Sequence, residues 1–134
     1  MGNGDVLAVN IFDMSGDNDY KLIRQDYIRD AIGVLLIYDV SIRSTFNNLS
    51  KWECEAISIG LDLSNIIVIL IANKLDIKSK REVSTKEGKE YAKLKGYQYY
   101  ETSAKTGSGV NDAFVNLLDS LHCKVLEVRS KFCY

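Results

Sequence analysis

The sequence predicts an α/β fold in which a parallel sheet carries helices on both faces. Strand-like and helix-like segments alternate from one end to the other, with no linker, charge block or repeat between them. The strand-like segments are short runs rich in Val, Ile and Leu, as expected of strands buried on both faces. A length of 134 residues with 46% hydrophobic and 26% charged residues indicates one folded domain with its own core.

Four segments are expected to form the strands. Three of them, Val6–Phe12, Gly33–Val40 and Ile66–Ala72, are nearly unbroken apolar runs, and the fourth, Tyr97–Glu101, is more polar. Runs of this length suit strands and fall far short of the roughly 20 apolar residues that span a bilayer. We therefore expect a sheet and no membrane-spanning segment.

Three amphipathic helices are expected between and after these strands. The first has a polar start at Ser44-Thr45 and then apolar residues at helical spacing, namely Phe46, Leu49, Trp52, Ala56 and Ile57. The second begins at a capping box, Ser84 with Glu87, and ends at Gly96, where a helix needs a left-handed residue. The third carries an apolar stripe over residues 110–125, which we expect to pack on the sheet.

Composition excludes several classes of function. Seventeen basic against eighteen acidic residues give a net charge of −1, without the basic excess of a nucleic-acid binder. Three cysteines without C-x-x-C spacing and a single histidine, His122, argue against a structural metal or a disulfide framework. The first residues lack the order of a signal peptide, so a cytoplasmic location is expected.

Candidate functional residues follow three of the four predicted strands. In open α/β sheets, ligands bind beyond the carboxyl ends of the strands. Residues 13–16 read Asp-Met-Ser-Gly, residues 73–76 read Asn-Lys-Leu-Asp, and residues 102–105 read Thr-Ser-Ala-Lys. Each motif alone also fits an ordinary surface turn. Their order, each after its own strand, favours one shared site.

The second and third motifs suit recognition of guanine. An ionised Asp76 can accept two hydrogen bonds, from the N1–H and the 2-amino group of guanine, and adenine offers no such pair. Lys74 can lay its aliphatic stem on the base, and Asn73 can tie the neighbouring loops together. The loop of Ser103, Ala104 and Lys105 would supply a backbone N–H to the guanine O6.

At these motifs the sequence resembles the Ras-like small GTPases, and among them the Rab branch. Further matches are Leu35–Val40 followed by Ser44-Thr45-Phe46, then Trp52, and Glu101–Gly107. The phrase Phe12–Gly16 is most similar to Rab-related proteins that elsewhere carry a J domain. The resemblance covers residues 6–121. It implies a three-layer fold like that of P-loop NTPases, GTP and GDP as ligands, Mg²⁺ as cofactor, and GTPase activity.

The resemblance also implies roles for the first motif. Asp13 would help to hold Mg²⁺ through a water, and the Gly16 N–H would sense a γ-phosphate. The following segment, residues 17–30, would be the second switch, which contacts effector or regulatory proteins. A capped turn after a strand is the alternative interpretation of residues 13–16.

The chain departs from the family at its phosphate-binding loop. No G-x-x-x-x-G-K-[ST] occurs, because no two of the nine glycines lie five positions apart. The match therefore begins at the family's third strand, and residues 1–134 correspond to the C-terminal two-thirds of one domain, with residues 126–134 as a short tail. The absent first strand would lie between Val6–Phe12 and Gly33–Val40. Either these two strands pair directly, or the sequence is an incomplete version of a longer protein, which is our expectation.

Three further features limit the expected activity. Asp17 stands where most relatives have a water-orienting glutamine, so no catalytic residue is assigned and hydrolysis is expected to be weak or absent. The chain has no proline and hence no J-domain signature, and Cys133 is not placed for a lipid anchor. A guanine-nucleotide switch is the main hypothesis. The alternatives are a non-catalytic interaction protein with a GTPase fold and a fragment or isoform of a longer GTPase.

Overall fold

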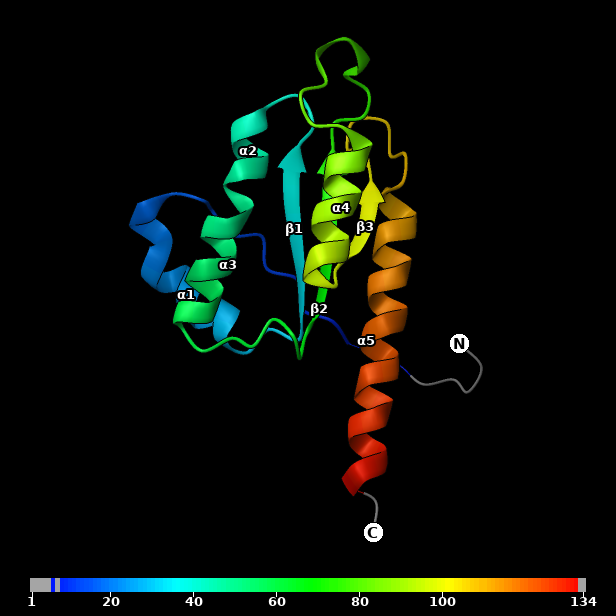
Figure 1. The fold of residues 1–134 in the computed structure, drawn as a ribbon. Coiled ribbons are helices and arrows are strands. Elements are labelled where there is room, and N and C mark those ends of the chain that lie inside the picture. Colours follow the sequence, from blue (N-terminus) through cyan, green and yellow to red (C-terminus); the bar gives the residue numbers. More distant parts are fainter. Residues whose placement is uncertain (1–5, 7, 133–134) are drawn as a thin grey trace.

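A parallel sheet of three strands forms the centre of the computed structural model, which describes residues 6 and 8–132. The strands are β1 (Gly33–Asp39), β2 (Ile67–Asn73) and β3 (Gln98–Glu101), and they lie side by side in chain order, as Figure 1 shows. The register pairs Gly33 with Ile67 and Ile69 with Gln98. The predicted α/β class with a parallel sheet is confirmed.

Helices cover both faces of this sheet (Figure 1). The described helical segments are η1 (Asn18–Tyr20), α1 (Lys21–Arg29), α2 (Arg43–Asn47), α3 (Leu49–Ser58), η2 (Lys78–Lys80), α4 (Thr85–Lys95) and α5 (Val110–Phe132). Residues 126–132, within the expected short tail, continue α5, and residues 133 and 134 lie outside the described residues. Among the described helices, none combines the length and apolar character needed to cross a bilayer.

Strand β2 is the middle of the core, because it is buried on both faces. Leu70 belongs to the cluster that packs against Phe46 of α2 and Tyr91 of α4. Ile69 and Ile71 point to the other face and belong to the cluster formed with α5. A strand buried on both sides needs apolar residues at successive positions, which explains the unbroken run in the sequence.

The start and the end of α4 lie where the sequence predicted them. The Ser84 hydroxyl accepts from the Glu87 N–H, the Glu87 carboxylate accepts from the Ser84 N–H, and α4 begins directly afterwards. Gly96 ends α4 in the left-handed conformation with φ of 74°. The single helix predicted from Phe46 onwards is divided into α2 and α3 at Asn48.

The predicted strand at Val6–Phe12 is wrong. Among the described residues of this segment, 6 and 8–12, none lies in a strand, and Val6 and Ile11 are 94% and 66% exposed. A strand needs a neighbour for its backbone hydrogen bonds, and an apolar run cannot supply one by itself. The described part of the segment does not pair with β1, so direct pairing of the two predicted strands is wrong as well.

The outer edge of β1 is consequently unpaired among the described residues. Ile67 donates to the Ile32 carbonyl and Val40 donates to the Asn73 carbonyl, so even-numbered residues of this strand bond to β2. The N–H and C=O groups of Leu35 and Ile37 therefore point away from β2. The Ile37 side chain is 55% exposed on the same strand.

Candidate functional site

Asn73, the last residue of β2, joins the loops that follow β2 and β3. Its Oδ1 accepts from the Thr102 hydroxyl at 3.1 Å and from the Ala104 N–H at 3.0 Å. The two strands are parallel neighbours, so their carboxyl ends lie side by side and one short amide side chain reaches across. We call residues 73–76 and 102–107 together the base loops.

Asp76 and Ser103 meet between the base loops. The Ser103 hydroxyl donates to Asp76 Oδ1 at 2.6 Å, and the same hydroxyl accepts from the Thr106 N–H at 3.2 Å. Ser103 is buried whereas Asp76 is exposed. The hydrogen bond from Ser103 holds the pKa of Asp76 below its ordinary value. The Asp76 carboxylate is thus an ionised acceptor in a defined position at the surface.

Lys74 is held by a carboxylate that the sequence motifs did not single out. Its Nζ lies 2.6 Å from Oδ2 of the buried Asp39, which ends β1 and is paired in register with Asn73. Burial would raise the pKa of Asp39, but the hydrogen bonds from Lys74 and Ser41 lower it below its ordinary value. The sequence did contain a signal for this role of Asp39, because an aspartate at the carboxyl end of a buried strand is a candidate site residue.

The backbone of the second base loop uses most of its N–H groups internally. Ser103 donates to the Ser108 carbonyl and Gly107 donates to the Ser103 carbonyl, at 2.9 and 2.8 Å. Ala104 and Thr106 donate to side chains of the base loops. Among the described residues, the Lys105 N–H has no acceptor, and this residue is exposed. One N–H of the loop is therefore available for a ligand.

The structure places Asp13 and Gly16 apart from the base loops. Both are exposed and lie outside helices and strands, and no hydrogen bond within the described part of the chain links them to the base loops. A Cβ at Gly16 would lie 3.4 Å from the Trp52 ring of α3. The first motif therefore lies against α3, while the other two meet at the ends of β2 and β3.

Arg24 fastens the first motif and α1 to α3. Its Nη1 donates to the carbonyls of Ser15 and Asp17 at 2.6 and 2.9 Å, and its Nε lies 2.8 Å from Glu55. Arg24 is 4% exposed, and it is the buried residue of α1, whose other residues are exposed or half-buried. This contact could not be predicted from the sequence pattern, because Arg24 and Glu55 lie in different helices.

Residues 17–30, the expected second switch, form η1 and α1. This segment carries four large exposed hydrophobic residues: Tyr20, Leu22, Ile23 and Tyr27. The Tyr27 ring lies 4.5 Å from the ring of Phe12, centroid to centroid. Solvent-exposed apolar side chains concentrated on one segment are typical of a protein-binding surface.

The described residues contain no cluster of three acidic, histidine or cysteine side chains that could hold a metal by themselves. Mg²⁺ accepts one or two carboxylates when phosphate oxygens and waters complete its octahedron. Asp13 fits the part of one such carboxylate, since it is exposed and lies three residues before Gly16.

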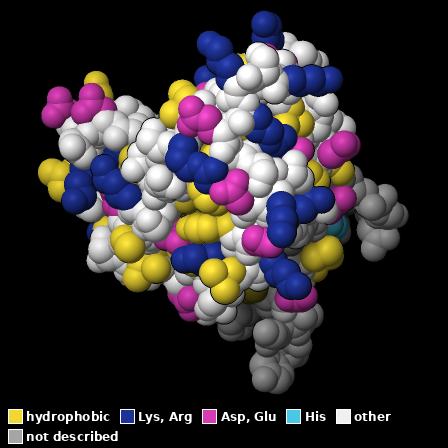
Figure 2. Space-filling model, turned by 45° about the horizontal axis from the view of Figure 1, so that its top comes forward, with side chains coloured by type: hydrophobic (Ala, Val, Ile, Leu, Met, Phe, Trp, Pro, Cys, Tyr) yellow, Lys and Arg dark blue, Asp and Glu magenta, His cyan; other side chains and the backbone are white. Residues whose placement is uncertain are grey.

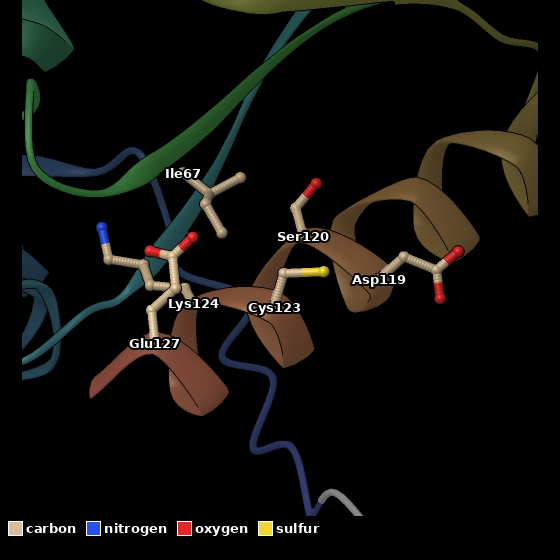
Figure 3. Close-up of a pocket in the computed structure, with 6 residues that line it drawn as sticks. All are labelled: Ile67, Asp119, Ser120, Cys123, Lys124 and Glu127. Atoms are coloured by element: carbon tan, nitrogen blue, oxygen red, sulfur yellow. The ribbon is translucent and has the colours of Figure 1, made fainter. Parts of the chain in front are cut away.

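A separate groove of about 440 Å³ lies at the opposite end of β2 from Asn73. Figure 3 shows its lining, which comes from the start of β2 and from α5: Ile67, Asp119, Ser120, Cys123, Lys124 and Glu127. It is shallow and contains no residue of the three sequence motifs.

The model of the Ras family matches residues 1–123 of this sequence. The chain belongs to the Ras family. The predicted resemblance to Ras-like small GTPases is therefore confirmed, and the base loops contain the second and third sequence motifs of this Ras-family chain.

A relative supports the Rab-related assignment. DnaJ homolog subfamily C member 27 of Danio rerio is 36% identical over 118 residues, which cover 86% of this chain and 43% of the relative. The chain thus spans less than half of that protein. The match agrees with the predicted similarity to Rab-related proteins that elsewhere carry a J domain.

Basic side chains surround the base loops of this Ras-family chain. Lys74, Lys78, Lys80 and Lys105 are all exposed there. Figure 2, which brings this end of the molecule forward, shows Lys and Arg side chains around it, with Asp and Glu side chains among them. Such a distribution raises the local concentration of anionic ligands.

Proposed function

We propose that this chain is the guanine-binding part of a Rab-like molecular switch that responds to GTP and GDP. The observation that supports it most directly is the Asp76 carboxylate, which is ionised, exposed and oriented by the buried Ser103 hydroxyl at 2.6 Å. A carboxylate in this state accepts two parallel hydrogen bonds and donates none. Guanine offers such a pair, whereas adenine does not.

The other groups of the base loops have complementary roles in this proposal. Asp76 accepts from the N1–H and the 2-amino group, and the Lys105 N–H donates to O6. The Lys74 stem lies against the base, because its ammonium group is fixed by Asp39. Asn73, Ser103 and Ala104 hold the two loops in register through their own hydrogen bonds.

Switching would involve the segment before β1. When bound with the nucleotide, Mg²⁺ supplies neutralisation of phosphate charge, and Asp13 would hold it through a water. The Gly16 N–H donates to the γ-phosphate, and residues 17–30 carry that difference to effector or regulatory proteins. The Arg24 contacts with Ser15 and Asp17 support this role, because they couple the first motif mechanically to α1.

Exchange of one atom at Asp76 tests the base assignment. Asp76→Asn replaces an acceptor oxygen by a donor NH₂, which opposes the guanine 2-amino group and matches the 2-carbonyl of xanthine. A mismatched donor costs about 1–3 kcal/mol, so the preference between GMP and XMP should move toward XMP by at least about tenfold. Competition measured by saturation-transfer NMR at millimolar ligand reads this ratio even for weak binding.

Asp62→Asn is the matched control for this substitution. Asp62 is also exposed and its Oδ1 also accepts from a serine hydroxyl, that of Ser64, at 2.6 Å, but it lies in the loop before β2. The control should leave the GMP to XMP ratio unchanged. If Asp76→Asn kept the wild-type ratio, Asp76 would not contact the base and the guanine site would be wrong.

A non-catalytic interaction protein is the second candidate function, and two sequence features favour it. The printed sequence has no G-x-x-x-x-G-K-[ST] motif, and the carboxylate side chain of Asp17 has no N–H to offer a transition-state oxygen. GTP turnover that disappears in Asp13→Ala would argue against this candidate.

For both candidate functions we propose a cytoplasmic location. Cys54 and Cys123 are free and exposed thiols, as in a reducing compartment.

A further inference from the structure

Glu101 accepts several hydrogen bonds directly before residues 102–107, which form the second base loop. It is the last residue of β3, and its Oε1 accepts from Arg81 Nη2 at 2.5 Å, from the Thr85 hydroxyl at 2.7 Å and from the Tyr99 hydroxyl at 2.9 Å. The donors come from the segment before α4, from the first turn of α4 and from β3 itself. A single carboxylate oxygen therefore ties the start of α4 to the end of β3.

The backbone of Glu101 is confined on another side by Gly109. A Cβ at Gly109 would overlap the Glu101 carbonyl oxygen, and Gly109 has φ of 69°, in the left-handed region. The chain thus returns from the second base loop directly onto the peptide from which that loop departs. Side-chain bonds and backbone packing together fix the orientation of this peptide.

Arg81 is itself held in place for this contact. Its Nε donates to the Val83 carbonyl at 2.7 Å, and its side chain is 27% exposed, close to the 24% of Glu101. Burial would raise the pKa of Glu101, but hydrogen bonds from Arg81, Thr85 and Tyr99 hold it below its ordinary value. Both partners are therefore charged at neutral pH, and charge-assisted bonds are the stronger class.

The geometry points to Arg81 and Glu101 as positioning residues for recognition of the guanine base. Thr102, which follows Glu101, donates to the Ala72 carbonyl at 2.8 Å and accepts from the Leu75 N–H at 3.1 Å. A tilt of β3 at Glu101 would displace Thr102 and move Ser103 away from Asp76. The inference rests on the proposed guanine site, and it assigns a role to residues that do not contact the base.

The test compares three substitutions in the full chain. Arg81→Met keeps the aliphatic stem and removes the donors to Glu101, so the Ala104 and Thr106 amides should exchange with solvent at least about fivefold faster. The preference for GMP over AMP, read by saturation-transfer competition, should fall by at least about fivefold. Arg81→Lys, which keeps the charge, should restore part of both.

Arg43→Met is the matched control. Arg43 forms a 2.6 Å ion pair with Glu87, so it also connects to α4, but it has no contact with Glu101. A role for Arg81 in stability alone would make the two methionine variants behave alike in both measurements. The positioning role instead predicts changed exchange and base preference in Arg81→Met only.

The outcomes separate the two proposals. A wild-type chain that does not prefer GMP to AMP would overturn the guanine site, while the amide exchange rates would still show whether Arg81 fixes the loop. A wild-type preference that survives in Arg81→Met, with unchanged exchange, would overturn the positioning role. Should Arg81→Met not fold, Thr85→Val, which removes one donor to Glu101, decides by the same two measurements.

Discussion

Glu87 shows how one side chain can serve two structural purposes. Its carboxylate accepts from Arg43 Nη1 at 2.6 Å, and from the Ser84 N–H and hydroxyl at 2.9 and 2.8 Å. The first bond connects α4 to α2, and the other two complete the cap of α4. These donors, Arg43 foremost, lower the pKa of Glu87 to about 2.

This pKa gives a prediction about acid stability. Because the folded-state pKa lies below the ordinary value of 4.5, Glu87 contributes stability above that value and loses its contribution as the pH falls toward about 2. Arg43→Gln removes the main cause and should raise the midpoint toward 4.5. Carboxyl chemical shifts followed by NMR between pH 2 and 6 measure it.

Arg29→Gln serves as the control, since Arg29 lies on α1 and makes no contact with Glu87. A Glu87 midpoint that stays near 2 in Arg43→Gln would show that the helix cap, rather than the ion pair, sets the pKa.

Single residues also mark the limit of what the sequence could predict about the site. The proximity of Asn73, Asp76 and Ser103 was predictable, because each residue stands in a short motif after a strand and the two strands are parallel neighbours. Other contacts are ion pairs between residues of different segments: Asp39 with Lys74, Arg81 with Glu101, and Glu55 with Arg24. No local pattern records such a pairing, so only the fold reveals it.

Helix α4 is the element that depends most on close packing. Gly88 is buried in its middle, directly above the hydroxyl groups of Tyr38 and Tyr99. A Cβ at this position would overlap the Tyr38 hydroxyl and would lie 2.8 Å from the Tyr99 hydroxyl. The glycine therefore allows α4 to approach the sheet, at some cost in helix propensity.

Gly88→Ala should consequently destabilise the protein although alanine is the better helix former. Overpacking of this kind costs about 1–3 kcal/mol, more than the gain in propensity of about 1 kcal/mol. Urea unfolding followed by circular dichroism measures the difference. Lys89→Ala, an exposed change on the same helix, should have little effect. Equal or greater stability in Gly88→Ala would mean that α4 can move away from the sheet at no cost.

The elements also differ in how far the sequence determines them. Helix α4 carries its own start and stop in Ser84, Glu87 and Gly96, so its bounds were predictable. The segment Val6–Phe12 has the composition of a strand but forms none in its described residues, because a strand depends on a neighbour that local composition cannot provide. Strand propensity alone therefore does not predict a strand, because a pairing partner is also needed.

At the scale of the whole molecule, the structure contains ordered base loops with basic side chains around them. The printed sequence contains no phosphate-binding loop. The G-x-x-x-x-G-K-[ST] loop of P-loop proteins holds phosphates with backbone N–H groups and a lysine. In the proposed function, nucleotide binding would therefore rest on a few hydrogen bonds from the exposed base loops to the guanine base.

We accordingly expect this chain to bind GTP and GDP more weakly than about micromolar, because most of the charge stabilisation of the phosphates is missing. Isothermal titration calorimetry with the folded chain measures the dissociation constant. A nanomolar constant for GTP would contradict this expectation.

The order of the strands bears on how the polypeptide acquires its shape during synthesis. Because β1, β2 and β3 lie side by side in chain order, each new strand adds to an edge that the ribosome has already released. No later strand has to be inserted between two earlier ones among the described residues, so no pairing must break for the sheet to grow. Helix α5 follows β3 in the chain and covers β2 on the face that holds Ile69 and Ile71. Until translation reaches that helix, this apolar face stays open to solvent and to chaperones.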